Sequence, residues 1–374
     1  MVLARALITS GFRNVGRRAR RTVSGRPARL ARTDPSGTLA RGRDVERIVF
    51  RLLDRMWYGR GGWGRCLAPL SLPYAASVRV RRVLFRRGLR TSHRIGVPVV
   101  VVGNIAVGGT GKTPLVVWLV HRLRAHGYRP GVICSGYRGH SRGWPRHVGA
   151  DSDPAEVGDE AVLVAKRCSC PVVAAPDRVS AARTLLGNAD CDILISDDGL
   201  QHYRLARDIE IAVLDGQRRH GTGWCFPAGP LREPVSRLES VDFVVVKGEA
   251  CEGEYRMELS GRLLRQAADD SVAIDPAELP AGTVHAVAGI GNPRPFFRRL
   301  RDLGLRISPH AFPDHHPFSS HDIEFHDGRP VIMTEKDAVK CRRFATGRHW
   351  YLPVDAEVDQ ALETELVARL GSPA

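Results

Sequence analysis

The N-terminal quarter of this 374-residue chain has no lysine and almost no acidic residues. Residues 1–96 contain 23 arginines and only four acids, Asp34, Asp44, Glu46 and Asp54, so their net charge is +19. Since the whole chain carries +16, the other 278 residues carry −3. An acidic partner attracted by this charge would therefore meet the N-terminal quarter.

Two further absences exclude whole classes of protein. No apolar run approaches the roughly 20 residues that a membrane-spanning helix needs. The eight cysteines are scattered and form no Cys-x-x-Cys pair, which argues against a zinc site or a disulfide scaffold and is typical of reduced, cytosolic thiols. With 43% hydrophobic and 26% charged residues, the chain is globular and long enough for two domains.

The first 44 residues have the composition of a basic flexible arm. They are rich in Arg, Gly, Ser and Pro and show no sustained apolar period, so they cannot bury enough surface to offset chain entropy. Three interpretations stay open: a solvated tail or over-read start, a transit peptide for organellar import, and a nucleic-acid-binding arm.

Residues 45–96 have the pattern of an amphipathic region. Apolar residues such as Ile48, Leu52 and Met56, and later Val80 and Val83, recur at helical spacing between arginines. Such a helix suits an anionic bilayer surface, where each Arg contributes about 1 kcal/mol. The alternative is a basic helical layer packed on the protein's own core.

A P-loop pattern follows this region. The apolar run Val99–Val102 leads into the glycine-rich segment Gly103–Thr113, and a helical pattern starts at Leu115. Strand, glycine-rich loop, Gly-Lys-Thr and helix together predict a loop whose N–H groups bind phosphate. The candidate nucleotide-binding residues are Ala106, Val107, Gly108, Gly109, Thr110, Gly111, Lys112 and Thr113. Lys112 would reach the transferred phosphate and Thr113 would ligate Mg²⁺, although Ala106 stands where the strict pattern has glycine.

Further short apolar runs predict an α/β fold with a P-loop-type parallel sheet flanked by helices. We expect a kinase core over 97–249, a polar linker over 250–282 and a smaller α/β domain over 283–374. The run Ile193–Ser196 ends in Asp197 and Asp198. Adjacent carboxylates at a strand end favour a cation, so either one is a candidate ligand for Mg²⁺. The expected strands are Val99–Val102, Gly131–Cys134, Pro171–Ala175, Ile193–Ser196, Ile209–Leu214, Val241–Val246, Val284–Ala288 and Pro330–Met333.

Eight ordered motifs resemble the tetraacyldisaccharide 4′-kinase family of lipid A biosynthesis. The resemblance runs from about Met56 to the C-terminus, and residues 1–44 have no counterpart in it. The motifs are Val97-Pro98 through Gly103-Asn104, Gly108 to Pro114, Gly158 to Glu160, Asp197 to His202, Pro227 to Pro234, Ala288 to Gly291, Phe312 to His316 and Met333 to Ala338.

The resemblance implies transfer of the γ-phosphate of ATP, with Mg²⁺, to the 4′-hydroxyl of an acylated glucosamine disaccharide 1-phosphate. It implies a monotopic protein on the cytoplasmic face of the bacterial inner membrane, bound to the anionic surface. It also implies roles for residues that would otherwise be read as ordinary surface or turn residues. These are a catalytic pair, Asp159 and His315; phosphate or sugar contacts from Arg178, His202 and Arg232; and a magnesium-site partner, Glu233.

Two positions depart from the family pattern. The segment Cys134–Gly139 has its arginine, Arg138, after Tyr137 rather than before the glycine, and Lys247 replaces a typical Asn. Two other functions fit the P-loop by itself: an ATPase acting on nucleic acid, suggested by the basic arm, and a nucleotide-binding switch without acceptor phosphorylation. Because the chain beyond residue 96 is net acidic, we do not expect nucleic acid as a partner.

Overall fold

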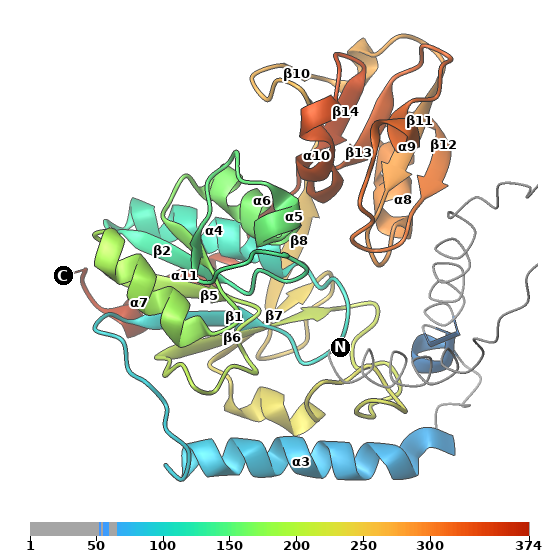
Figure 1. The fold of residues 1–374 in the computed structure, drawn as a ribbon. Coiled ribbons are helices and arrows are strands. Elements are labelled where there is room, and N and C mark those ends of the chain that lie inside the picture. The colour runs from blue at the N-terminus through green and yellow to red at the C-terminus, as the bar shows by residue number, and fades with distance from the viewer. Residues whose placement is uncertain (1–51, 54, 60–65, 374) are drawn as a thin grey trace, which may run out of the picture. The chain divides into compact units, whose positions relative to one another are not determined.

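The computed structural model describes residues 52–53, 55–59 and 66–373. The expected basic arm over 1–44 and most of the region up to residue 65 lie outside the described residues. Two sheets organise the described chain, and Figure 1 shows them in separate lobes. We call the part built on the first sheet the core lobe and the part built on the second sheet the small lobe.

The core lobe contains a nine-stranded sheet with the order β15-β8-β7-β6-β1-β5-β2-β4-β3. Every neighbouring pair from β8 to β4 is parallel, and the edge strands β15 and β3 are antiparallel to their neighbours. The expected P-loop α/β fold is therefore confirmed. The strands are β1 (Val99–Gly103), β2 (Pro130–Cys134), β3 (Arg146–His147), β4 (Val172–Ala174), β5 (Ile193–Asp197), β6 (Ile209–Asp215), β7 (Phe243–Lys247), β8 (Tyr255–Ser260) and β15 (Asp355–Val358).

Helices cover both faces of this sheet, which is why its central strands are apolar throughout. Val100 and Val102 pack in a cluster with side chains of α4, α6 and α11, whereas Val99 and Val101 pack in a second cluster with α7. The helices of the core lobe are α4 (Lys112–Ala125), α5 (Pro154–Val157), α6 (Asp159–Cys168), α7 (Arg178–Asn188), η2 (Val235–Ser240) and α11 (Gln360–Leu370).

The small lobe contains a six-stranded sheet with the order β10-β9-β14-β13-β11-β12. Its two faces are packed by separate clusters, one with Phe297 and Leu300 of α8 and one with Ala338 and Cys341 of α10. The elements are β9 (Leu264–Gln266), β10 (Ala273–Ile274), η3 (Pro276–Glu278), β11 (Thr283–Ala288), α8 (Arg294–Asp302), β12 (Arg306–Ala311), α9 (Ser320–Ile323), β13 (Val331–Thr334), α10 (Glu335–Cys341), η4 (Arg342–Phe344) and β14 (His349–Leu352).

The region expected to be a linker contains strands of both sheets, and the end of the expected C-terminal domain belongs to the core lobe. Residues 250–282 contain β8, which extends the first sheet, and β9 and β10, which extend the second. The chain then returns, so that β15 pairs with β8 and α11 packs on the core lobe. Tyr255, Met257 and Leu259 alternate with polar residues in β8, and this alternation is typical of a strand with one buried face rather than of a linker.

Helix α3 (Ala68–Arg86) lies along the core lobe on the side opposite the small lobe (Figure 1). Its inner face is held by polar contacts: Ser71 Oγ donates to the Cys225 carbonyl over 2.8 Å, and the Tyr74 hydroxyl donates to the Arg232 carbonyl over 3.2 Å. Its outer face exposes large apolar side chains, Leu72, Val80 and Val83, and Leu70 is exposed beside the inner face. Within the described residues, no helix is both long enough and apolar enough to cross a bilayer.

Candidate active site

The P-loop connects β1 to α4 in a conformation that requires glycine at two points. Gly108 and Gly111 have φ values of +123° and +94°, in the left-handed region that L side chains disfavour. A Cβ atom on Gly111 would also lie 3.0 Å from Met257 Cε. Asn104 Nδ2 donates to the Gly108 carbonyl and to Thr110 Oγ1, both over 3.3 Å, and this ties the loop to the end of β1.

Ala106 fits the loop although the strict pattern has glycine there. It is buried, and it forms a β-bridge with Leu231, while the neighbouring Val107 N–H donates to the Pro230 carbonyl over 2.8 Å. The Pro227–Pro234 motif therefore supports the P-loop from the side. Helix α4 then begins at Lys112 with no acidic side chain in its first turn, which leaves its N–H groups suited to an anion.

Asp197 and Asp198 lie beside this loop and differ in charge environment. Parallel pairing of β1 with β5 sets Val102 opposite Asp197, so the P-loop and the aspartates leave the same edge of the sheet. Asp198 is 3.5 Å from Lys112 Nζ and accepts from Arg232 Nη1 over 3.1 Å. Burial alone would raise the pKa of Asp198, but Lys112 and Arg232 hold it well below its usual range.

Asp197 has the opposite environment. Burial, assisted by the neighbouring carboxylate of Glu160, raises the pKa of Asp197 to about 7. Its Oδ1 atom is buried and has no hydrogen-bonding partner among the described residues. An unsatisfied buried carboxylate oxygen beside a second carboxylate is what a bound cation would stabilise, so the donor set fits Mg²⁺.

The described residues contain no cluster of three or more His, Cys, Asp or Glu that could hold a metal by themselves. This agrees with a magnesium site of the P-loop kind, in which one or two protein ligands and the nucleotide phosphates share the ion. Thr113, at the second position of α4, and Asp197 could supply the two protein oxygens of such a site.

Glu233 is not brought to this pair. Its side chain is buried, and its oxygens accept hydrogen bonds from Gln201 Nε2, over 2.8 Å, and from the Tyr203 hydroxyl. Arg237 Nε is 3.4 Å from its Oε2. Gln201 Nε2 also donates to the Asn104 carbonyl over 3.0 Å, so this glutamine links the Glu233 side chain to the P-loop, while the Glu233 N–H donates to the Ile105 carbonyl over 3.4 Å.

Arg178 is buried rather than exposed to a phosphate. Its Nη1 donates to the Ala175 carbonyl over 3.0 Å and its Nη2 donates to the Asp197 carbonyl over 2.7 Å. Burial lowers the pKa of Arg178. The guanidinium therefore fixes the main chain at the ends of β4 and β5. His202 lies nearby, where burial and the Arg178 charge lower its pKa to about 4 and keep it neutral.

Asp159 and His315 form a direct pair across the two lobes. Gly158, with φ +92°, lets α6 start at Asp159, and His315 has φ +58° in the loop after β12. His315 Nδ1 is 2.9 Å from Asp159 Oδ2. Burial opposes charge on Asp159, but the hydrogen bond from His315 and the ammonium groups of Lys336 and Lys340 hold its pKa well below its usual range.

Two further charged residues adjoin this pair, and sequence analysis assigned neither a role. Lys336, in α10, places its Nζ 2.9 Å from Glu160 Oε1 and 3.3 Å from His315 Nε2. The Lys336 charge lowers the pKa of Glu160. Both residues belong to motifs that carried the resemblance, Gly158–Glu160 and Met333–Ala338, and that membership was the only sequence signal for them.

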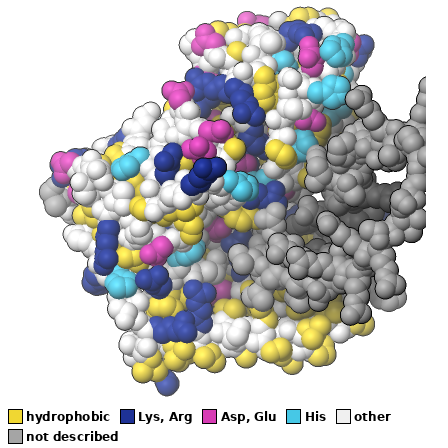
Figure 2. Space-filling view, viewed as in Figure 1, with side chains coloured by type: hydrophobic (Ala, Val, Ile, Leu, Met, Phe, Trp, Pro, Cys, Tyr) yellow, Lys and Arg dark blue, Asp and Glu magenta, His cyan; other side chains and the backbone are white. Residues whose placement is uncertain are grey.

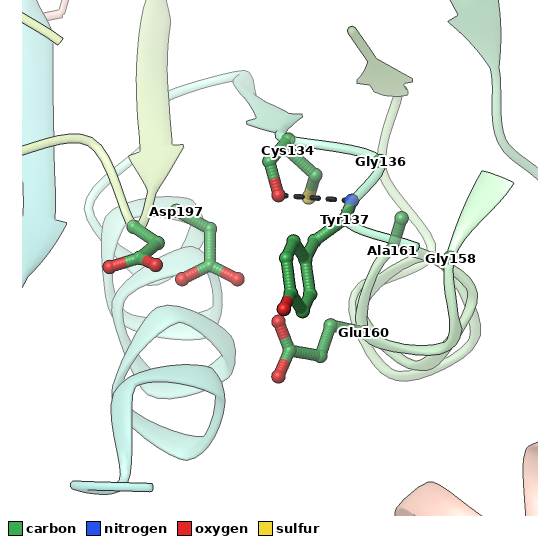
Figure 3. Close-up of a pocket in the computed structure, with 9 residues that line it drawn as sticks. Cys134, Gly136, Tyr137, Gly158, Glu160, Ala161 and Asp197 are labelled. Carbon is green, nitrogen blue, oxygen red and sulfur yellow. Dashed lines mark hydrogen bonds between the residues drawn. The ribbon is translucent and has the colours of Figure 1, made fainter. Parts of the chain in front are cut away.

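A polar recess lies between the strand ends and α6. It is lined by Cys134, Ser135, Gly136, Tyr137, Gly158, Glu160, Ala161, Asp197 and Asp198. In Figure 3 the Tyr137 ring stands between Asp197 and Glu160, with its hydroxyl toward the Glu160 carboxylate. The recess therefore joins the metal-site aspartate to the helix that carries Asp159.

The structure gives a physical reason for each departure from the family pattern. Arg138 Nη1 donates to the Asp314 carbonyl over 3.0 Å, and the Tyr137 ring packs edge-on against His315 at 5.4 Å between centroids. The displaced arginine thus fixes the loop that holds His315. Lys247 forms an ion pair with Asp215, and its Cδ would be 3.8 Å from a Cβ on Gly111, so its stem packs beside the P-loop.

Comparisons with known proteins agree with this geometry. A family model described as tetraacyldisaccharide-1-P 4′-kinase matches residues 63–371. The chain is 50% identical over 320 residues to the tetraacyldisaccharide 4′-kinase of Nitrosococcus oceani, covering 85% of this chain and 94% of that one. It is 54% identical over 305 residues to the enzyme of the same name from Alkalilimnicola ehrlichii, covering 81% and 92%.

A solved structure is similar as well. The crystal structure of LpxK from Aquifex aeolicus in complex with ATP superposes with a TM-score of 0.72 at 27% identity. The match covers 83% of this chain and 100% of that chain. The likeness thus spans both lobes.

Proposed function

The chain belongs to the tetraacyldisaccharide-1-P 4′-kinase family, and we propose that it transfers the γ-phosphoryl group of ATP to the 4′-hydroxyl of tetraacyldisaccharide 1-phosphate. The product is the bis-phosphorylated lipid A precursor, lipid IVA. The observation that carries the proposal is the placement of two sets of groups at one recess. A P-loop with its strand-end aspartates lies on one side, and the Asp159–His315 pair adjoins the other.

Lys112 and the loop from Ala106 to Thr113 bind the nucleotide. The N–H groups at the start of α4 and the positive end of the helix suit the β- and γ-phosphates, and Lys112 neutralises charge on the transferred group. In the structure Lys112 is 3.5 Å from Asp198, so the P-loop lysine has a counter-ion that keeps it in place. Arg232 shares that counter-ion and adds a second cation at the same edge.

Thr113 and Asp197 would hold Mg²⁺, whose positive charge would offset the negative charge that develops during transfer. Asp197 is the direct ligand of the two aspartates because its Oδ1 lacks a partner among the described residues, whereas Asp198 is already paired with Lys112 and Arg232. Arg178 positions Asp197 through its carbonyl. Glu233 supports the loop through Gln201 rather than contacting the ion.

Asp159 is the base for the acceptor hydroxyl. Its lowered pKa keeps it ionised at neutral pH, and it accepts the hydroxyl proton as the new O–P bond forms and the bond to the β,γ-bridging oxygen breaks. ADP leaves with that oxygen. Because phosphoryl transfer depends mostly on positioning, a weak base suffices. His315, bonded to Asp159, orients the carboxylate toward the hydroxyl.

Helix α3 binds the membrane surface from which the lipid acceptor comes. Leu72 and Val80 share one face of this helix and are 60% and 57% exposed, and Figure 2 shows apolar side chains gathered along that edge of the molecule. Arginines follow on the same helix, from Arg79 to Arg86. Apolar side chains flanked by arginines suit the surface of an anionic bilayer, here the cytoplasmic face of the bacterial inner membrane.

One assay tests the proposed function. The purified protein is incubated with γ-labelled ATP, Mg²⁺ and a detergent-dispersed tetraacyldisaccharide 1-phosphate, and label is followed into the lipid. We expect one phosphate per acceptor, at the 4′ position. Label confined to inorganic phosphate and stimulated by DNA or RNA would favour a nucleic-acid ATPase instead, and bound nucleotide without transfer would favour a switch.

A further inference from the structure

Lys336 is the one buried cation that contacts His315 among the residues described, and no step of the proposed reaction uses it. It lies in α10 of the small lobe, with its side chain 18% exposed. Its Nζ reaches Glu160 of the core lobe over 2.9 Å and His315 Nε2 over 3.3 Å, with Asp314 Oδ1 at 3.8 Å. It therefore touches the side of the imidazole that faces away from Asp159.

The partners of His315 determine which of its nitrogens carries the proton. Nδ1 faces two carboxylate oxygens of Asp159, at 3.1 Å and 2.9 Å, and an ionised carboxylate only accepts hydrogen bonds. Nε2 faces an ammonium group, which only donates. Asp314 Oδ2, at 3.7 Å from Nε2, is beyond hydrogen-bonding distance. These contacts fit a ring that donates from Nδ1 and accepts at Nε2.

We propose that Lys336 is a positioning residue for the phosphoryl transfer: by donating to His315 Nε2 it holds the imidazole in the neutral Nδ1–H form that orients the Asp159 carboxylate. The inference rests on the proposed function, since it concerns the base of that reaction. Without the ammonium, Nε2 would lose this donor, and the ring proton could shift from Nδ1 to Nε2. A bare Nδ1 could not donate to the Asp159 carboxylate that has to accept the hydroxyl proton.

The charge of Lys336 is itself fixed by the core lobe. Burial opposes that charge, but the carboxylates of Glu160, Asp159 and Asp314 raise the pKa of Lys336 above its usual range. Glu160 follows Asp159 at the start of α6, so the carboxylate that pairs with Lys336 and the carboxylate that binds His315 come from the same helical turn. His315 thus lies between the carboxylate of Asp159 and the ammonium of Lys336. Lys336 in turn is paired with Glu160, the residue next to Asp159.

The test uses Lys336→Met, Lys336→Arg and a matched control, Arg167→Met. Arg167 forms another ion pair between α6 and α10, with Glu335 at 2.9 Å, and its guanidinium bonds Glu335 and Asp355 rather than His315 or Asp159. We expect Lys336→Met to lower kcat roughly 10- to 100-fold, part of the roughly 10²- to 10⁴-fold that a positioned base supplies. KM for ATP should stay within about twofold, and Lys336→Arg should restore much of kcat because it keeps a donor and a charge.

The control separates positioning from simple anchoring of the lobes. If α10 only needs an ion pair to α6, Arg167→Met would lower kcat as much as Lys336→Met does, and Lys336 would have no role beyond anchoring. Thermal unfolding of the three variants accounts for any loss of folded protein. An unchanged kcat in Lys336→Met would overturn the proposal outright.

A second measurement does not depend on the acceptor. Nitrogen-15 NMR of histidine-labelled protein distinguishes protonated from unprotonated ring nitrogens, and comparison with His315→Asn identifies the signals of His315. We expect a protonated Nδ1 and an unprotonated Nε2 in the wild type, and loss of this pattern in Lys336→Met. The same pattern in both proteins would refute the inference, whereas absence of lipid phosphorylation by the wild type would refute the proposed function alone.

Discussion

Replacing Asp159 by asparagine tests the acceptor side of the site with the smallest change of shape. In the structure Asp159 Oδ1 accepts from the Glu160 N–H over 3.0 Å, and Oδ2 accepts from His315 Nδ1 over 2.9 Å. Asparagine has one oxygen for these two donors. Whichever way the amide is turned, its NH₂ group faces an N–H, so the substitution removes both the negative charge and one of the two hydrogen bonds.

The size of the effect follows from the role of a base. A positioned base contributes roughly 10²- to 10⁴-fold to the rate, which is about 2.7–5.4 kcal/mol at 1.36 kcal/mol per factor of ten. We therefore expect kcat of Asp159→Asn to fall at least about 100-fold. The P-loop hydrogen bonds do not involve Asp159, so KM for ATP should change by no more than about twofold.

The assay compares Asp159→Asn with Lys112→Ala under the same conditions. Transfer from labelled ATP to the lipid gives kcat and KM, and a fluorescent ATP analogue gives nucleotide affinity directly. Lys112→Ala should impair nucleotide use, because it removes the cation next to the phosphates. If both variants weaken ATP binding equally, Asp159 belongs to the nucleotide site and its assignment as base is wrong.

Three other expectations follow from the described contacts. Mg²⁺ should bind about tenfold more weakly at pH 6 than at pH 8 in calorimetric titrations with an ATP analogue. The reason is that Asp197, whose pKa is raised to about 7, must lose its proton to ligate a cation. Equal affinities at the two pH values would argue against Asp197 as a ligand. Leu72→Ser with Val80→Ser should weaken binding to anionic vesicles about 10- to 100-fold, since each side chain contributes part of the roughly 1.5–3 kcal/mol of a fully buried valine or leucine, and unchanged partitioning would exclude this face of α3. Glu233→Gln should lower the free energy of unfolding by about 1–3 kcal/mol, because Tyr203 and Gln201 lose a charged acceptor; in a denaturant titration, an unchanged free energy would contradict the supporting role.

The centre of the core lobe could be predicted from the sequence because its strands are buried on both faces. Runs such as Val99–Val102 and Ile193–Ser196 are apolar at every position or nearly so, and only a strand between two helix layers needs that. Their ends then place Lys112 and Asp197 at one edge without further information. Two strands at one end of the sheet, β8 and β15, could not be found in this way, since both are half polar and β15 comes from far along the chain to pair with β8.

The charged residues were harder to place than the strands. Arg178 reads as an exposed arginine, and nothing local shows that two carbonyls at strand ends will bind its guanidinium. Glu233 alone reads as a surface acid, and the resemblance implies a magnesium-site role, whereas in the structure Gln201 and Tyr203 bond its oxygens. Burial of a charge depends on partners distant in sequence, which composition and periodicity do not report.

The way the small lobe is inserted into the core lobe affects the proposed catalytic pair, Asp159 and His315. The small lobe leaves the core lobe after β8 and returns at β15, and these two strands are paired with each other in the first sheet. The small lobe is therefore inserted between two adjacent strands, rather than appended by a single linker. Its orientation at the core lobe then depends on that strand pair and on the ion pairs between α10 and α6.

The insertion explains how His315 of the small lobe can bind Asp159, the proposed base, which lies in the core lobe. A single linker would leave the small lobe free to rotate. The 2.9 Å hydrogen bond between His315 and Asp159 would then have to fix the orientation of the small lobe by itself. Two paired strands remove most of that freedom before the side chains meet, so less entropy is lost when the pair forms. The remaining freedom lies along α6 and α10, where Lys336 and Arg167 form their ion pairs, and this is where substitutions should change turnover without changing nucleotide affinity.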